Sequence, residues 1–99
     1  MKYVLLGELS ADWAVKQEKR VTTARSKLKE LGMKVESVYY TQGEHDFVDI
    51  VDAPNPETML AFSVWYAQQG YGRIRSMPAF DERQMVAALK RTGARRKKS

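Results

Sequence analysis

The 99-residue sequence contains no cysteine, one histidine and only three prolines. Without cysteine there is no disulfide framework, no thiolate nucleophile and no cysteine-ligated metal. No apolar run approaches the roughly 18 residues that a membrane-spanning helix needs. The first residues, MKYVLLGELSADW, lack the small-residue cleavage site of a signal peptide. We therefore expect a cytoplasmic protein that makes no contact with a membrane.

Positive charge is concentrated at the C-terminus. The net charge is +5, but six of the seventeen basic residues lie within the last ten positions. Residues 1–89 therefore carry eleven basic and twelve acidic groups. We expect a domain over residues 1–90 and a disordered, solvated tail over residues 91–99. The alternative is a contact between this tail and RNA, DNA or another acidic surface, although acids in the predicted strands disfavour nucleic-acid binding by the domain itself.

Periodicity and turn residues predict the secondary structure. Apolar runs of strand length, rich in β-branched and aromatic residues, predict strands, and helical spacing bounded by capping residues predicts helices. The predicted strands are Lys2–Glu8, Met33–Thr41, His45–Asp52 and Tyr71–Ala79, and the predicted helices are Trp13–Leu31, one that begins at Pro56 and one that follows Asp81. The order β-α-β-β-α-β and then a helix is that of a ferredoxin-like α+β domain, with one antiparallel sheet and an added C-terminal helix.

The predicted sheet is apolar on both faces, whereas its helices cover only one of them. We assign Val4, Leu6, Val48 and Ile50 to the helix-covered face, and Tyr3, Leu5, Phe47 and Val51 to the opposite face. Soluble monomers rarely expose an apolar patch of this kind. We therefore expect the protein to bury this face against a second copy, sheet to sheet, as a homodimer or a higher homo-oligomer.

The second predicted helix carries apolar residues on more than one face. Its regular apolar set is Leu60, Ala61, Val64 and Ala67. Trp65 and Tyr66 lie on other faces, and aromatic residues are frequent at the centre of protein interfaces. We therefore expect these two rings to pack on a neighbouring molecule.

His45 and Asp49 are the candidate catalytic residues. A histidine ordinarily titrates near neutral pH, so His45 is either a general base, a proton shuttle or a ligand to a metal or haem iron, or else a turn residue in solvent. Asp49 lies by alternation on the face that we expect to be buried between protomers, where a carboxylate needs a partner. It either forms an interface ion pair with Arg73 or Arg75, or lines a pocket for a small ligand.

A set of aromatic and polar residues is the candidate lining of a ligand pocket: Tyr3, Tyr39, Tyr40, His45, Asp46 and Asp49. Tyrosines suit an apolar pocket as well as a core or an oligomer contact. Asp46 has a structural alternative, which is to hydrogen-bond the loop backbone of a hairpin in which Gly43 adopts a positive φ. One histidine among scattered acids is too few ligands for a metal, so we expect no metal site.

The stretch YYTQGEHDFVDIVDAP and the NPETMLAF that follows it resemble the corresponding segment of GYD-domain proteins, which are small bacterial proteins. These commonly carry a glycine, a spacer, a tyrosine and an aspartate before a hydrophobic strand that ends in an acid and Ala-Pro. Gly43, Glu44, Asp46 and the ending Asp52–Pro54 match this pattern, and His45 stands where the tyrosine is usual. YVLLGEL and RIRSMPAF resemble the first and last strands of the family, so the resemblance covers residues 1–90.

The resemblance implies a ferredoxin-like domain of the dimeric α+β-barrel type, and it brings no established reaction. Related barrels include cofactor-free monooxygenases, isomerases, haem-handling enzymes and ligand-sensing domains. We therefore expect a homo-oligomeric domain with a small-ligand-binding or accessory role and no required cofactor, with haem or flavin left open. The alternative is a small monooxygenase- or isomerase-like enzyme that acts on an apolar or aromatic molecule in a barrel pocket.

Overall fold

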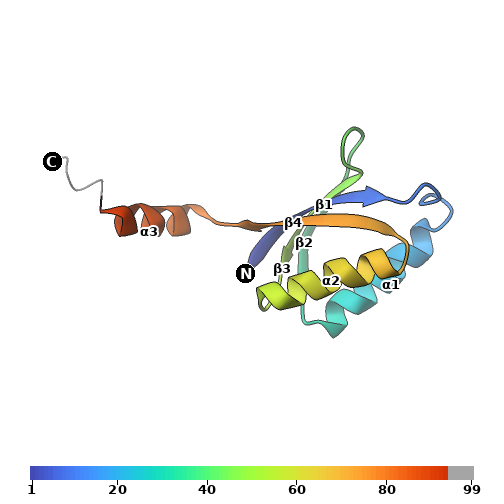
Figure 1. Ribbon diagram of the computed structural model, residues 1–99, viewed down its shortest axis with the longest axis horizontal. Helices are drawn as coiled ribbons and strands as arrows, with labels where there is room; N and C mark the ends of the chain where they lie inside the picture. The colour runs from blue at the N-terminus through green and yellow to red at the C-terminus, as the bar shows by residue number, and fades with distance from the viewer. Residues whose placement is uncertain (94–99) are drawn as a thin grey trace.

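A computed structural model describes residues 1–93, which form a four-stranded sheet and three helices (Figure 1). The elements are β1 (Lys2–Leu9), α1 (Gln17–Glu30), β2 (Lys34–Tyr40), β3 (Phe47–Asp52), α2 (Pro56–Gln68), β4 (Gly72–Ala79) and α3 (Glu82–Thr92). None of the helices in this part of the chain has the length and apolar character needed to cross a membrane.

The sheet has the strand order β2-β3-β1-β4, and every neighbouring pair is antiparallel. Helices α1 and α2 both lie on one face of it (Figure 1). In this register Leu5 of β1 stands opposite Asp49 of β3 on one side and Ser76 of β4 on the other. The order of elements and strands confirms the predicted ferredoxin-like α+β fold with an added C-terminal helix.

Local sequence explains where α2 begins and where α1 ends. Asn55 caps α2, because its Oδ1 accepts a hydrogen bond from the Thr58 backbone N–H at 2.8 Å, and Pro56 occupies the first turn. Gly32 ends α1 with a φ of 72°, and the next backbone N–H, that of Met33, donates to the Leu28 carbonyl at 2.9 Å.

The start of α1 differs from the prediction. The helix begins at Gln17 rather than at Trp13, and no side chain caps it. The residues before it form turns, in which the Asp12 carboxylate accepts a hydrogen bond from the Ser10 hydroxyl at 2.8 Å and pairs with Lys16 at 3.1 Å. The carboxylate that could cap a longer helix is therefore engaged locally.

The two faces of the sheet are the reverse of our assignment. Tyr3, Leu5, Phe47 and Val51 face the helices and are buried in the core, so that the opposite set, Val4, Leu6, Val48 and Ile50, lies on the outer face. When a strand is apolar on both sides, the alternation of its side chains does not indicate which side faces the core. Gly7 favours the observed orientation of the strands. It has no side chain, so the Phe47 ring fills the space on the inner face of the sheet where a Cβ would lie.

The buried face of α2 also differs from the prediction. Met59, Phe62 and Tyr66 are buried, whereas Leu60 and Val64 are 63% and 48% exposed. The larger side chains bury more apolar area, and their spacing of three and four residues places them on one side of the helix. Tyr66 therefore belongs to the core of its own chain rather than to a surface for a neighbour.

Helix α3 extends from the end of β4 away from the rest of the domain (Figure 1). A capping box between Asp81 and Gln84 fixes its first turn, and it packs on no other helix or strand among residues 1–93. Because α3 runs to Thr92, the start of the predicted tail is helical. The remainder of the tail, residues 94–99, lies outside the described residues.

Candidate functional site

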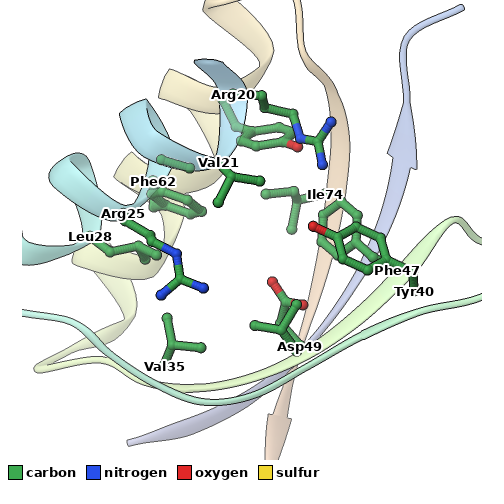
Figure 2. A pocket seen from close by; sticks show the side chains of 13 residues that line it. Arg20, Val21, Arg25, Leu28, Val35, Tyr40, Phe47, Asp49, Phe62 and Ile74 are labelled. Carbon is green, nitrogen blue, oxygen red and sulfur yellow. The ribbon is translucent and has the colours of Figure 1, made fainter. Parts of the chain in front are cut away.

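A cavity of about 70 Å³ lies between α1 and the sheet. Its floor is the inner face of β2 and β3, and α1, α2 and β4 supply the walls (Figure 2). The inward residues of β2 at its edge, Val35, Val38 and Tyr40, remain 37%, 39% and 53% exposed, so this edge strand is only partly covered. The cavity therefore opens to solvent along β2. Its lining residues are Arg20, Val21, Ala24, Arg25, Leu28, Val35, Val38, Tyr40, Phe47, Asp49, Phe62, Tyr66 and Ile74.

Two groups of opposite charge line this cavity, the buried Arg20 and the half-buried Asp49. Arg20 is only 4% exposed, and its Nη1 has no hydrogen-bond partner among the described residues. Across the cavity, Oδ1 of Asp49 is also buried and unpartnered within residues 1–93. Figure 2 shows the Asp49 carboxylate and the Arg25 guanidinium directed into the space between α1 and the sheet. Buried polar atoms are nearly always hydrogen-bonded, so two unpartnered ones at one cavity are unusual.

The surroundings shift the pKa values of two lining groups. Burial raises the pKa of Asp49 from 3.8 to about 6, and the positive charges of Arg20 and Arg25 offset only part of this rise. Burial likewise raises the pKa of Tyr66 to about 12, against the opposing effect of Arg20. At neutral pH Asp49 is therefore mostly an acceptor carboxylate close to its titration point, and Tyr66 is a neutral phenol.

The cavity combines a hydrogen-bond donor, an acceptor and apolar walls in a small volume. Since a water molecule needs about 10–15 Å³ of such space, the cavity holds about five waters, or a molecule of about one ring. Arg20 offers a charged donor, Asp49 offers an acceptor, and Val21, Leu28 and Phe62 offer apolar contact between them. Within residues 1–93, no three histidine, aspartate or glutamate side chains are grouped so as to hold a metal ion.

The structure brings two of the six predicted pocket residues to this cavity, Asp49 and Tyr40. Tyr3 is buried in the core, and Tyr39 is 65% exposed on the outer face, so neither lines the cavity. His45 and Asp46 lie at the end of the β2–β3 hairpin. Asp46 Oδ2 accepts a hydrogen bond from the Leu9 backbone N–H at 2.7 Å, so it bonds the end of β1 rather than the backbone of its own hairpin loop. It also lines a second hollow, of about 500 Å³, together with Tyr40 and Trp13.

Two expectations about Asp49 were wrong, because the face to which it belongs turns toward the helices. It is enclosed by its own chain rather than by a second protomer, and its neighbouring cations are Arg20 and Arg25 of α1. Arg73 and Arg75 stand opposite Glu8 and Leu6 on the outer face of the sheet.

Arg20 is a candidate site residue that we did not identify from the sequence. It occurs four and eight residues before Ala24 and Leu28, which also face the sheet, so the three share one side of α1. An arginine in register with the apolar side of a helix is the signal that could have revealed it. From the sequence, Arg20 was expected on the outside of the helix with Lys16, Lys19, Lys27 and Lys29.

Comparison with models of protein families identifies the family of this chain. The family model of the GYD domain matches residues 3–89 of the chain. The chain belongs to the GYD domain family. The segment that carries the resemblance, residues 43–54, forms the turn of the hairpin and strand β3, and so supplies the cavity with Phe47 and Asp49. His45, which stands where this family usually has a tyrosine, lies outside the cavity, and its Nδ1 is buried without a partner among the described residues.

Comparison of the GYD domain with solved structures finds the same fold in proteins of different function. It is similar to 5-chloro-2-hydroxyhydroquinone dehydrochlorinase from Burkholderia phenoliruptrix in complex with 2,5-dihydroxybenzoquinone, with a TM-score of 0.61 and 10% identity over 85% of this chain and 98% of that one. It is also similar to 30S ribosomal protein S6 from Thermotoga maritima, with a TM-score of 0.60 and 13% identity over 90% of this chain and 96% of that one.

These similarities establish the fold. They do not show the function, which has to be inferred from the residues of the site. One neighbour is an enzyme and the other is a ribosomal protein, which illustrates that a fold does not determine an activity. Comparison of the sequence with curated proteins finds no match.

Proposed function

We propose that this GYD domain binds a small organic molecule, about one ring in size, in the cavity between α1 and the sheet. The observation that carries the proposal is the pair of buried, unpartnered atoms, Nη1 of Arg20 and Oδ1 of Asp49, at the same cavity. Leaving a buried charged group without a hydrogen bond is costly. A ligand that satisfies both atoms at once recovers this cost on binding.

The two groups define the ligand chemistry. Arg20 requires an acceptor, such as a carbonyl or an ionised oxygen, and Asp49 requires a hydroxyl that donates to it. The aliphatic and aromatic walls favour an apolar ring between these two oxygens. The ligand of the dehydrochlorinase neighbour, 2,5-dihydroxybenzoquinone, is a one-ring compound that bears both hydroxyl and carbonyl groups. The proposal requires neither a flavin nor a haem.

Binding of simple probes tests the proposal. We expect catechol, which has two ring hydroxyls, to bind and to produce saturation-transfer signals and a rise in melting temperature. Toluene, of similar size but without polar groups, should bind at least tenfold more weakly, since a site built around buried polar atoms rejects ligands that leave them unpaired. Failure of every hydroxylated one-ring probe to bind at millimolar concentration would refute the proposal.

Variants of the two charged groups sharpen the test. Asp49→Asn and Arg20→Gln should each weaken catechol binding by about tenfold or more, which corresponds to the loss of one charge-assisted hydrogen bond. Asp52→Asn and Arg75→Gln change the same residue types outside the cavity and should leave the affinity unchanged. Unaltered binding in both cavity variants would place the ligand elsewhere.

We further propose that the domain acts as a homo-oligomer. The outer face of the sheet carries Val4, Leu6, Val48 and Ile50, and no described part of the chain covers it. The amphipathic helix α3 is likewise unpartnered within residues 1–93, with Met85 and Leu89 57% and 50% exposed. A second copy of the chain could cover both the outer face of the sheet and the apolar side of α3. In this arrangement the outer faces of the two sheets lie against each other.

The connection between β4 and α3 supports a partner rather than self-packing. Phe80 and Asp81 alone join the two elements, and both ends of this link are fixed. On one side Ala79 pairs with Lys2 in the sheet, and on the other Asp81 forms the capping box. Within residues 1–93, α3 does not pack on its own sheet, and short links of this kind favour exchange between copies.

Size-exclusion chromatography with light scattering tests the oligomer. We expect a mass of at least twice the 11.4 kDa of the single chain at micromolar concentration. Ile50→Lys, which places a charge on the outer face, should shift the population toward the monomer, whereas Glu57→Lys at the exposed start of α2 should not. A wild-type protein that elutes as a monomer would contradict this second proposal and leave the ligand proposal standing.

A further inference from the structure

Arg20 and Asp49 face one cavity but do not pair with each other. None of the ion pairs among the described residues includes either side chain, although a buried guanidinium and a buried carboxylate attract each other strongly. The fold holds them on different elements, α1 and β3, with the cavity between them (Figure 2). A base and a cation fixed on opposite sides of a small apolar space are the two parts that proton abstraction from carbon requires.

We propose that this cavity catalyses proton transfer at a carbon next to a carbonyl group, with Asp49 as the base and Arg20 as the group that stabilises the enolate. The inference rests on the proposed binding of a one-ring ligand at the same site. It goes further by assigning a reaction and a separate role to each charged residue.

The reaction needs no cofactor and no second substrate. Asp49 removes a proton from the carbon next to the carbonyl, so a C–H bond breaks and an O–H bond forms on the carboxylate. The electron pair of the C–H bond becomes a carbon–carbon double bond, and the carbonyl oxygen takes the negative charge as an enolate. Arg20 donates a hydrogen bond to that oxygen. Return of the proton to the same carbon exchanges it, and return to another carbon gives an isomer.

The groups around Asp49 suit this role. From α1, the positive charges of Arg20 and Arg25 favour its ionised form, and burial opposes them with the larger effect. The resulting pKa of about 6 keeps the carboxylate ionised at neutral pH while making it a stronger base than an ordinary aspartate. Tyr66 from α2, with a pKa of about 12, and Tyr40 from β2 complete the titratable groups at the cavity.

The apolar walls strengthen the interaction with the developing charge. Val21, Leu28, Phe62 and Ile74 surround the space between the two charged groups. Beside such walls, which exclude part of the surrounding water, a fixed donor stabilises an enolate more than it does in bulk water. The guanidinium remains charged throughout the reaction, so only the carboxylate changes its protonation state.

Deuterium exchange into cyclohexanone, a one-ring ketone, measures this activity. In D₂O at pH 7.5, we expect the full-length protein to increase the rate at which NMR detects loss of the hydrogens next to the carbonyl. Asp49→Asn should remove about 99% of the increase, since a positioned general base contributes at least 10²-fold. Arg20→Gln should reduce it by a similar factor, as loss of an oxyanion donor does. The wild-type rate should rise with pH through about 6 and then level off.

The controls separate this inference from the proposed binding. Asp52→Asn and Arg75→Gln lie outside the cavity and should exchange at the wild-type rate, and far-ultraviolet circular dichroism verifies the fold of every variant. If catechol binds but cyclohexanone exchanges no faster than in buffer, the catalytic inference is wrong while the binding proposal holds. Exchange that persists in Asp49→Asn also overturns it. If neither compound binds, both proposals fail together.

Discussion

The two helices that cover the sheet make very different contributions to the domain. Helix α2 buries Met59, Phe62 and Tyr66 against the sheet, whereas the buried residues of α1 are Leu28 and the charged Arg20. The α2 side is a packed core, and the α1 side encloses a cavity. The difference shows how one small domain separates the part that stabilises it from the part that is available for a ligand.

The largest expected effect lies on the α2 side. Met59 is 1% exposed and lies outside the cavity lining, so Met59→Ala should lower the free energy of unfolding by about 2–5 kcal/mol through lost burial and a new void. Its neighbour Leu60 is 63% exposed, and Leu60→Ala should change stability by no more than about 0.5 kcal/mol. Urea denaturation measures both. Equal effects at the two positions would mean that α2 is not packed as described.

A smaller effect of opposite sign is expected on the α1 side. Because the pKa of Asp49 rises from 3.8 unfolded to about 6 folded, the folded state binds more protons between these values, and stability falls as pH rises through this window. Asp49→Asn removes this loss. Allowing for solvent screening, it should raise the free energy of unfolding by about 2 kcal/mol at pH 8 and by little below pH 4.

Denaturation at several pH values tests this prediction, and Asp52 provides the control. A hydrogen bond from the N-terminal ammonium group, at 2.8 Å, lowers the pKa of Asp52. Its contribution to stability is therefore present at neutral pH and is lost as the pH falls, so Asp52→Asn should be destabilising near pH 7. If Asp49→Asn destabilises the protein at pH 8, the carboxylate has a structural partner that contradicts the site described above.

Enlargement of two alanines compares free space on the two sides. Ala53 is 2% exposed in the core, and Ala53→Leu should cost about 1–3 kcal/mol through overpacking. Ala24 lines the cavity, so Ala24→Leu has room for its added atoms and should change stability by less than about 1 kcal/mol. It should also abolish catechol binding. Thermal unfolding and probe titration measure the two outcomes.

The smallest effect concerns the first turns of the helices. Asn55 caps α2 through its side chain, and Asn55→Ala should cost about 1 kcal/mol. Lys16 precedes α1 and makes no capping hydrogen bond, so Lys16→Ala should alter stability by no more than about 0.5 kcal/mol. A similar loss at both positions would mean that the start of α1 is more ordered than its turns indicate.

The fold was predicted well from the sequence because the residues that begin and end the helices and strands act locally. Asn55-Pro56, Gly32 and the aromatic and β-branched runs each determine the structure of their own neighbourhood, so the elements and their order followed from them. The strand faces depended instead on a distant contact, that of Phe47 with Gly7, which no local pattern contains. The chosen faces of β1 and β3 were therefore reversed.

The candidate site was predicted only in part, for the same reason. Asp49 was recognised because a carboxylate within an apolar strand is conspicuous, and Tyr40 because an aromatic ring suits an apolar pocket. Arg20 was expected on the outside of its helix, and only the packing of α1 over the sheet reveals that it lines the cavity. A cavity is a property of how elements pack, so the sequence alone does not display it.

Gly7 allows the cavity to be adjusted through the sheet. The Phe47 ring rests on this glycine with one side and borders the cavity with the other, while hydrogen bonds to β3 and β4 hold the β1 backbone in place. A methyl group at position 7 would overlap the Phe47 ring, and we expect it to push that ring toward the cavity. Gly7 does not line the cavity itself, but through Phe47 it helps to determine the size of the ligand that we propose for this site.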